Sequence, residues 1–286
     1  MAHHFTLECR QRTNFASSCV VLPTPKTTKS GSRKHDSDRF WLNLGRLRLK
    51  VRRMHARSWR SLAYSLTGAM LLVSGVASAI AQNSVDLALV LAVDASGSVD
   101  AVRFDLQKRG YVAAFRHARV LQAIRSGAHQ AIAVTMLQWT GPSLHVQVVD
   151  WTRIGSEEST AAFAAAIERA PRRLFGGGTS ISGAVDYGST LFASSLFHAS
   201  RRVIDVSGDG SNNRGRPAAL ARDEAVAAGI AINGLPILAL EPDLDRYYYN
   251  NVIGGPGAFV VPAQDYETFA DAVLKKLITE IAANMR

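Results

Sequence analysis

Three short segments of this chain hold small, oxygen-bearing side chains of the kind that bind a metal ion. Asp94, Ser96 and Ser98 alternate with small residues at the end of an apolar run. Thr179 follows three consecutive glycines, and Asp209 stands between two glycines after another apolar run. Two carboxylates and three hydroxyls form an all-oxygen set, which hard divalent cations prefer. The set predicts a cation site if the fold brings the three segments together.

The hydrophobic pattern around these segments predicts alternating strands and helices. Apolar runs predict strands at residues 85–93, 131–139, 144–151, 202–207, 230–238 and 259–261. Helical spacing predicts one helix opened by Asp100 and others at residues 156–170, 180–195, 216–228 and 265–281. The short turn at residues 140–143 predicts that the two strands beside it form an antiparallel hairpin.

We therefore predict an α/β fold with a doubly wound, mostly parallel central sheet, one antiparallel edge strand and helices on both faces. In open parallel sheets ligands gather at the carboxyl ends of the strands, because the loops that leave the strands meet there. Asp94 and Asp209 both stand at such strand ends. Asp205 competes with Asp209 for the last ligand position, but it lies inside an apolar strand. A buried acid there requires a partner, so we interpret Asp205 as a structurally paired residue.

The segments that contain Asp94, Ser96 and Ser98, Thr179, and Asp209 resemble the metal-ion-dependent adhesion site of von Willebrand factor A domains. The resemblance covers roughly residues 84–283. The stretches "VIDVSGDGSNN" and "NNVIGGPGAFVV" are most similar to a bacterial secreted subfamily of unassigned role. The resemblance implies a Rossmann-like fold in which the two serines contact the metal directly. It implies that the threonine and the acids act directly or through water, and that the last helix can shift on binding. Gly208 departs from the family pattern, which commonly has threonine before the final Asp-Gly.

The function that this resemblance implies is metal-dependent protein binding rather than catalysis. Mg²⁺ is the expected metal, with Mn²⁺ and Ca²⁺ as alternatives, and an Asp or Glu of a protein partner would complete its coordination. The alternative is a metal-dependent hydrolase or phosphotransferase that uses Asp94 as nucleophile. Enzymes of the aspartyl-phosphate type generally need a second acid two residues later, where this chain has Ser96. We therefore predict no catalytic residue; the identity of the partner and the oligomeric state stay open.

An acidic cluster and a run of tyrosines lie outside the predicted metal site. Glu241, Asp243 and Asp245 lack the glycine and terminal glutamate of a calcium loop, so we interpret them as a solvated acidic loop. The run at residues 247–249 is three tyrosines, of which at least one is expected in the core and the others could form a recognition patch.

The charge of the chain lies mainly outside the predicted domain. The formal net charge is +10, but residues 1–81 hold 14 of the 33 Lys and Arg residues and only 3 of the 23 Asp and Glu residues. Residues 82–286 are therefore nearly neutral, whereas a nucleic-acid surface needs clustered basic residues on the domain itself. Both cysteines, Cys9 and Cys19, precede the domain, which excludes disulfides and cysteine metal sites within it.

The residues before the domain predict export. Residues 54–81 combine a basic start, an uncharged apolar stretch and small residues suited to cleavage after Ala79 or Ala81, as in a secretory signal peptide. The alternative is a membrane anchor over residues 62–81, so a membrane contact is expected only through an uncleaved leader. Residues 1–53 are interpreted as a disordered extension or an unused upstream start. The predicted location of the domain, residues 82–286, is periplasmic or secreted.

Overall fold

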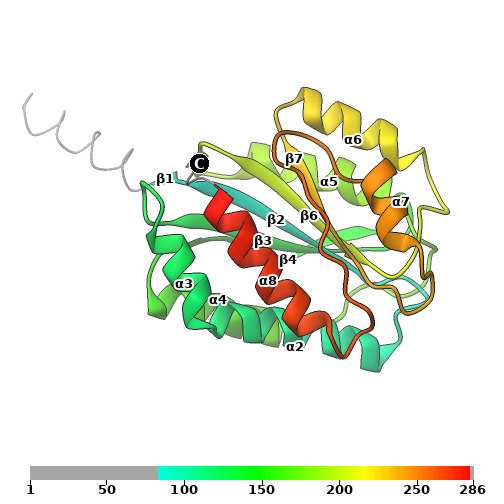
Figure 1. Cartoon of the computed structure of the whole chain (residues 1–286), viewed down its shortest axis with the longest axis horizontal. Helices are drawn as coiled ribbons and strands as arrows, with labels where there is room; N and C mark the ends of the chain where they lie inside the picture. Colours follow the sequence, from blue (N-terminus) through cyan, green and yellow to red (C-terminus); the bar gives the residue numbers. More distant parts are fainter. Residues whose placement is uncertain (1–82, 284–286) are drawn as a thin grey trace, which may run out of the picture. The chain divides into compact units, whose positions relative to one another are not determined.

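The computed structural model describes residues 83–283, and the predictions for residues 1–53 and 54–81 lie outside this range. A five-stranded sheet with the order β4-β3-β2-β6-β7 forms the centre of the domain (Figure 1). Its strands are β2 (Leu87–Asp94), β3 (Ile132–Trp139), β4 (His145–Ile154), β6 (Arg202–Gly208) and β7 (Ala231–Pro236). Only β4 runs antiparallel to its neighbour, as predicted for the hairpin. A separate parallel pair joins β1 (Ser84–Val85) to β5 (His198–Ala199).

Strand β2 lies in the middle of the sheet, and all of its residues are buried. Its alternate side chains enter two hydrophobic clusters, with Leu89 and Leu91 on one face and Val90 and Ala92 on the other. A strand covered on both faces needs a continuous apolar sequence. The apolar run that ends at Asp94 therefore follows from the central position of β2.

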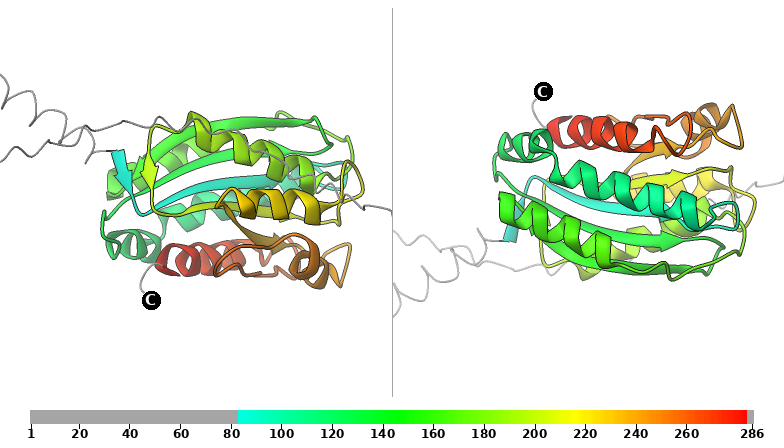
Figure 2. Two further views of the ribbon diagram at one scale, coloured as in Figure 1. Left: turned by 90° about the horizontal axis from the view of Figure 1, so that it is seen from above. Right: turned by 90° about the horizontal axis from the view of Figure 1, so that it is seen from below.

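Helices cover both faces of the sheet (Figure 2). The Leu89 face packs against α2 (Ala101–Arg116), α3 (Ala118–Arg125), α4 (Glu157–Arg169) and α8 (Phe269–Ala282). The Val90 face packs against α5 (Ile181–Ser194), α6 (Ala218–Ala227) and α7 (Leu244–Asn251). This arrangement confirms the predicted fold class.

The starts of two helices follow from capping side chains in the sequence. Asp100 Oδ1 accepts a hydrogen bond of 2.8 Å from the Arg103 amide at the start of α2. Ser156 and Ser159 form a reciprocal capping box at the start of α4. Both side chains satisfy amide groups that have no partner within their helix.

One predicted strand and one predicted helix start were wrong. Residues 259–261 form no regular strand, because the segment after α7 meets β7 only through isolated bridges such as Gly234 with Val260. The last helix begins at Phe269 rather than at residue 265. Asp265 and Thr268 hydrogen-bond to each other's backbone and hold a turn there. This turn buries Tyr266, which is 4% exposed.

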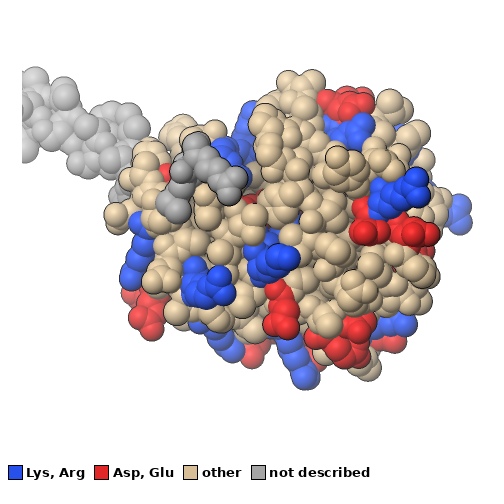
Figure 3. Space-filling model, in the orientation of Figure 1, with Lys and Arg blue, Asp and Glu red and all other residues tan. Residues whose placement is uncertain are grey.

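Acidic and basic side chains are interspersed on the face that shows α8 (Figure 3). Among the described residues, no helix is both long and apolar enough to cross a membrane.

Candidate metal site

The segments that contain Asp94 and Asp209 meet at the carboxyl ends of β2 and β6. Ser98 Oγ donates a hydrogen bond of 2.6 Å to Asp209 Oδ1, and Ser96 Oγ lies 3.1 Å from Ser98 Oγ. Thr179 approaches from the start of α5, where its Oγ1 lies 3.7 Å from the place that a Cβ on Gly210 would occupy. The fold thus brings the Ser98 hydroxyl to the Asp209 carboxylate and places the Thr179 hydroxyl near Gly210, the next residue.

Asp94 has the least satisfied carboxylate of the group. Its side chain is fully buried, and Oδ1 accepts a hydrogen bond of 2.7 Å from the Ser96 amide. Oδ2 is buried and accepts no hydrogen bond from the protein. Burial, and then the charge of Asp209, raise the pKa of Asp94 to about 7, although interactions with the Ser96 hydroxyl and amide and with the Asp209 amide favour ionisation. A buried carboxylate oxygen without a partner is costly, and a bound cation would offset that cost. The site therefore fits a divalent ion.

Asp209 has both carboxylate oxygens engaged. Tyr266 donates a hydrogen bond of 2.8 Å to Oδ2, while Ser98 donates to Oδ1. The Arg103 guanidinium lies 5.5 Å from the centre of the Tyr266 ring and donates to the Ser98 carbonyl at 2.7 Å. Burial, and then Asp209, raise the pKa of the Tyr266 hydroxyl, which keeps it a donor. Tyr266 therefore joins the site to the segment that leads into α8.

Arg172 holds the backbone of the loop that follows β2. Its Nη2 donates to the carbonyls of Ala95 at 3.0 Å and Ser96 at 3.3 Å. Its guanidinium lies between the rings of Phe104 and Phe175, 5.3 and 4.8 Å from their centres. Arg172 therefore fixes the backbone of the loop that holds Ser96.

The Thr179 loop depends on glycine and on Asn213. Gly178 adopts a φ of 81°, in the left-handed region that favours glycine. Asn213 Oδ1 accepts from the Thr179 amide at 2.9 Å, and the Thr179 carbonyl accepts from the Asn213 amide at 2.9 Å. This reciprocal pair fixes the threonine against the loop that follows Asp209.

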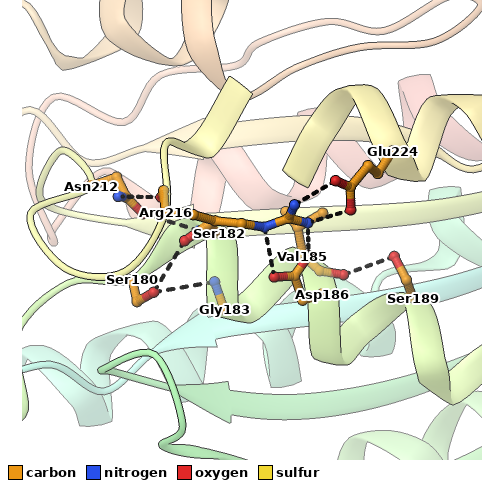
Figure 4. A network of polar contacts seen from close by, with 9 residues as sticks. All are labelled: Ser180, Ser182, Gly183, Val185, Asp186, Ser189, Asn212, Arg216 and Glu224. Atoms are coloured by element: carbon orange, nitrogen blue, oxygen red, sulfur yellow. Dashed lines mark hydrogen bonds and ion pairs between the residues drawn. The ribbon is translucent and has the colours of Figure 1, made fainter. Parts of the chain in front are cut away.

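The same loop is tied to α5 by a second polar network (Figure 4). Asn212 Oδ1 accepts from the Ser182 amide at 3.0 Å. The Arg216 guanidinium bridges Asp186 of α5 and Glu224 of α6, with its Nη1 2.6 Å from Glu224 Oε1. Hydrogen bonds to Glu224 and then Asp186 raise the pKa of Arg216, which stays charged. Asn212 and Asn213 thus serve the conformation of the loop.

Gly208, the departure from the family pattern, has a steric cause. A Cβ at this position would lie 2.9 Å from Asp94 Oδ2 and 3.1 Å from both Trp139 Cζ2 and the Tyr248 hydroxyl oxygen. Trp139 and Tyr248 are fully buried. Their rings therefore fill the space that a threonine side chain would need in this chain.

Asp205 and Glu241 make structural contacts outside the candidate metal site. Asp205 pairs with Lys276 of α8, with 2.6 Å between Oδ1 and Nζ, which confirms its interpretation as a paired buried acid. Glu241 accepts hydrogen bonds of 3.0 and 3.1 Å from the Ser211 amide, so it fastens the loop after Asp209. Of the three tyrosines, Tyr248 is in the core and Tyr249 is 69% exposed. Within residues 83–283, no three His, Cys, Asp or Glu side chains form a metal cluster, so the candidate site depends on its hydroxyls.

Sequence comparison assigns the family. Residues 84–285 match the model of a family described as "Protein of unknown function (DUF1194)". The chain belongs to the DUF1194 family. No curated protein matches it in sequence.

Solved structures show which fold this DUF1194 domain has. The open conformation of the pilus adhesin SpaC from Lactobacillus rhamnosus GG is similar at a TM-score of 0.51 and 16% identity, over 70% of this chain and 30% of that one. Another form of SpaC gives a TM-score of 0.50 at the same identity, over 70% of this chain and 31% of that one. The proximal thread matrix protein 1 of the mussel byssus, with a zinc-occupied MIDAS motif, gives 0.49 at 12% identity, over 69% of this chain and 46% of that one. The domain thus has a von Willebrand factor A fold and spans less than a third of the SpaC chains.

Proposed function

We propose that this DUF1194 domain is a protein-binding module that acts through a divalent cation. Asp94, Ser96, Ser98, Thr179 and Asp209 would hold the cation, with Mg²⁺ as the expected ion and Mn²⁺ or Ca²⁺ as alternatives. A carboxylate from a protein partner would complete the coordination. When bound, the ion supplies the positive charge that attracts this carboxylate.

The observation that carries this proposal is Asp94 Oδ2. It is a buried carboxylate oxygen without a hydrogen-bond donor, and the charge of a second buried carboxylate, Asp209, acts on it. Two acids in such proximity disfavour each other's ionised form, and a divalent cation removes the repulsion. The neighbouring hydroxyls add oxygen ligands without adding negative charge. The site therefore supports binding of a small divalent ion with residual positive charge.

The surroundings of the site favour an acidic partner. Arg103 donates to the Ser98 carbonyl and Arg172 to the Ala95 carbonyl, so both positive charges lie beside the loop that holds Ser96 and Ser98. Positive charge at a binding edge attracts acidic surfaces and disfavours basic ones. Catalysis is less well supported, because no histidine among the described residues is hydrogen-bonded to Asp94 or Asp209 as a general base would be.

Calorimetric titration of chelator-treated protein with MgCl₂, MnCl₂ and CaCl₂ tests the metal step. We expect the protein to bind at least one of these ions and the Ser98→Ala variant to lose that binding. Ser126→Ala removes an exposed hydroxyl at the end of α3 and is the matched control, which should bind as the unmodified protein does.

Capture from a cell-envelope extract tests the partner step. We expect a protein that is retained with the bound ion and released by chelator, and retention should fail with Ser98→Ala but not with Ser126→Ala. Retention of the same protein in equal amounts with chelator would show that the cation is not part of the interface.

We also propose that the domain is exported to the periplasm or secreted. The mature chain should begin at Ile80 or Gln82, which N-terminal sequencing of protein from the cell envelope would determine. Recovery of the uncleaved leader in a membrane fraction would instead support the anchor.

A further inference from the structure

A second group of charged side chains is buried between α8 and the sheet, and the proposed cation site does not use it. It consists of the charged residues Lys276 and Glu280 on α8 and Asp205 on β6, together with the polar residue Asn233 on β7. All four side chains belong to residues that are at most 2% exposed. Charged residues are almost never fully buried unless they are paired, so their arrangement here requires an explanation.

The lysine amine lies against the carboxyl group of Asp205. Lys276 Nζ is 2.6 Å from Asp205 Oδ1, the distance of a close ion pair. Nζ also donates a hydrogen bond of 3.1 Å to Glu280 Oε2. The Lys276 amine thus contacts the carboxyl groups of both Asp205 and Glu280.

Two more contacts orient Glu280 and enclose the amine. Asn233 Nδ2 donates a hydrogen bond of 2.7 Å to Glu280 Oε1, and Asn233 Oδ1 accepts from the Phe259 amide at 2.9 Å. Lys276 Nζ lies 5.3 Å from the centre of the Phe259 ring. An apolar ring on one side and oriented acids on the other keep water from the amine.

The surroundings of this cluster favour a protonated Asp205. The two carboxyl groups of the cluster share one lysine in the core, and the Arg201 guanidinium, which donates to the Glu280 carbonyl at 3.1 Å, lies on the Glu280 side. Burial is the largest influence on Asp205 and raises its pKa to about 7, although Lys276 lowers it, and Glu280 raises it further. Lys276 Nζ already donates a hydrogen bond to Glu280 Oε2, so a proton can pass along this contact from the amine to the carboxylate. A neutral amine is a nucleophile, and a protonated carboxyl group can lose water.

We propose that Lys276 and Asp205 are a modification site at which an intramolecular amide bond forms between Nζ and Cγ. Glu280 takes a proton from the Lys276 ammonium, and the Nζ lone pair then attacks Cγ of the protonated Asp205. Glu280 gives its proton to the departing hydroxyl and takes the second proton that the nitrogen releases, so the Nζ–Cγ bond forms, a Cγ–O bond breaks, one water leaves and Glu280 ends protonated. No oxidant or reductant is needed. The reaction replaces a buried ion pair by a neutral amide, which removes the cost of burying its two charges.

The bond would connect α8 covalently to the central sheet. Residues 205 and 276 are far apart in sequence, so the link would restrict the unfolded chain and raise stability. It would also hold α8 in place at Lys276, independently of any ion at the proposed cation site.

Intact-mass spectrometry of the denatured protein tests the proposal. The unmodified protein should be lighter than its own sequence requires by one water molecule, relative to the Lys276→Met variant corrected for the substitution. This comparison cancels any processing of the N-terminus. Peptide mapping should recover one branched peptide that contains both Asp205 and Lys276.

Two further variants separate the reaction from general effects on folding. Glu280→Gln retains an oxygen that can accept from Asn233 but cannot relay the proton, so this variant should fold and keep the water. Lys275→Met changes the exposed neighbouring lysine and should still lose the water.

Two results would overturn the proposal. A folded protein that keeps its full mass would show that the cluster is only an ion pair. A mass loss that persists in Lys276→Met would place the dehydration elsewhere, for example in a cyclic imide at Asp209-Gly210, and peptide mapping would identify that position.

Discussion

Replacement of Asp94 by asparagine should stabilise the metal-free protein at alkaline pH. The pKa of Asp94 is raised from 3.8 to about 7 by burial and by Asp209. For a carboxyl group whose pKa is raised by folding, the contribution to stability is fully present below the unfolded pKa and is lost as the pH rises through the folded pKa. Above about pH 7 the folded state therefore bears the whole cost of ionising Asp94.

The size of this cost follows from the shift. About three pKa units correspond to about 4 kcal/mol, at 1.36 kcal/mol for each unit. The asparagine side chain has nearly the same shape, and its oxygen can accept the hydrogen bond from the Ser96 amide. In chelator, Asp94→Asn should thus be more stable than the unmodified protein by about 4 kcal/mol near pH 8, and the difference should shrink toward about pH 4.

Urea unfolding followed by circular dichroism gives the free energies of unfolding. Asp150→Asn, which replaces an exposed carboxylate on β4, is the control and should change stability by no more than about 0.5 kcal/mol. With saturating MgCl₂ the advantage should narrow or reverse, because the ion stabilises only the protein that binds it. If Asp94→Asn is no more stable than the unmodified protein in chelator near pH 8, the Asp94 carboxylate does not destabilise the fold, and the argument for a cation at Oδ2 is wrong.

Three other variants test the supports of the site. Gly208→Ala should lower the free energy of unfolding by about 1–3 kcal/mol in urea, because its Cβ would crowd fixed rings, whereas Gly97→Ala meets nothing closer than 3.6 Å and should be tolerated. Tyr266→Phe removes the hydroxyl that donates to Asp209 and should weaken Mg²⁺ binding about tenfold in calorimetry; unchanged affinity would show that this hydrogen bond does not orient the acid. Arg216→Met should lower stability by less than about 1 kcal/mol, and in thermal unfolding added salt should reduce the difference, because the ion pairs are partly exposed.

Much of the fold could be predicted because its signals are local. A continuous apolar run specifies a central strand such as β2, and a polar cap such as Asp100 or Ser156 specifies the start of a helix. The choice between Asp205 and Asp209 was also local, since an acid within an apolar strand needs a buried partner. The identity of that partner, Lys276, was not predictable, because it lies on a helix much later in the chain.

The residues that contact the site from other elements could not be predicted either, because their contacts join parts of the chain that are far apart in sequence. Tyr266 reaches Asp209 from a turn that was predicted as helix, and no pattern around it signals a hydroxyl aimed at an acid. The need for glycine at position 208 depends on Trp139 and Tyr248, which come from two other elements. The helix α3, with eight residues, is short enough that its apolar side chains gave no separate signal.

The irregular pairing beside β7 affects how molecules of this protein meet at high concentration. The segment after α7 bridges β7 at separate points, Ile232 with Gly254, Gly234 with Val260 and Ile237 with Ala263. This segment covers the outer side of β7, where an added strand from a second molecule would otherwise pair. At the opposite border, β4 has irregular register with β3 and exposes the charges of Asp150 and Arg153. Covered or charged edge strands of this kind resist edge-to-edge pairing between sheets of different molecules. Molecules at high concentration can therefore expose their loops without aggregating through their strands.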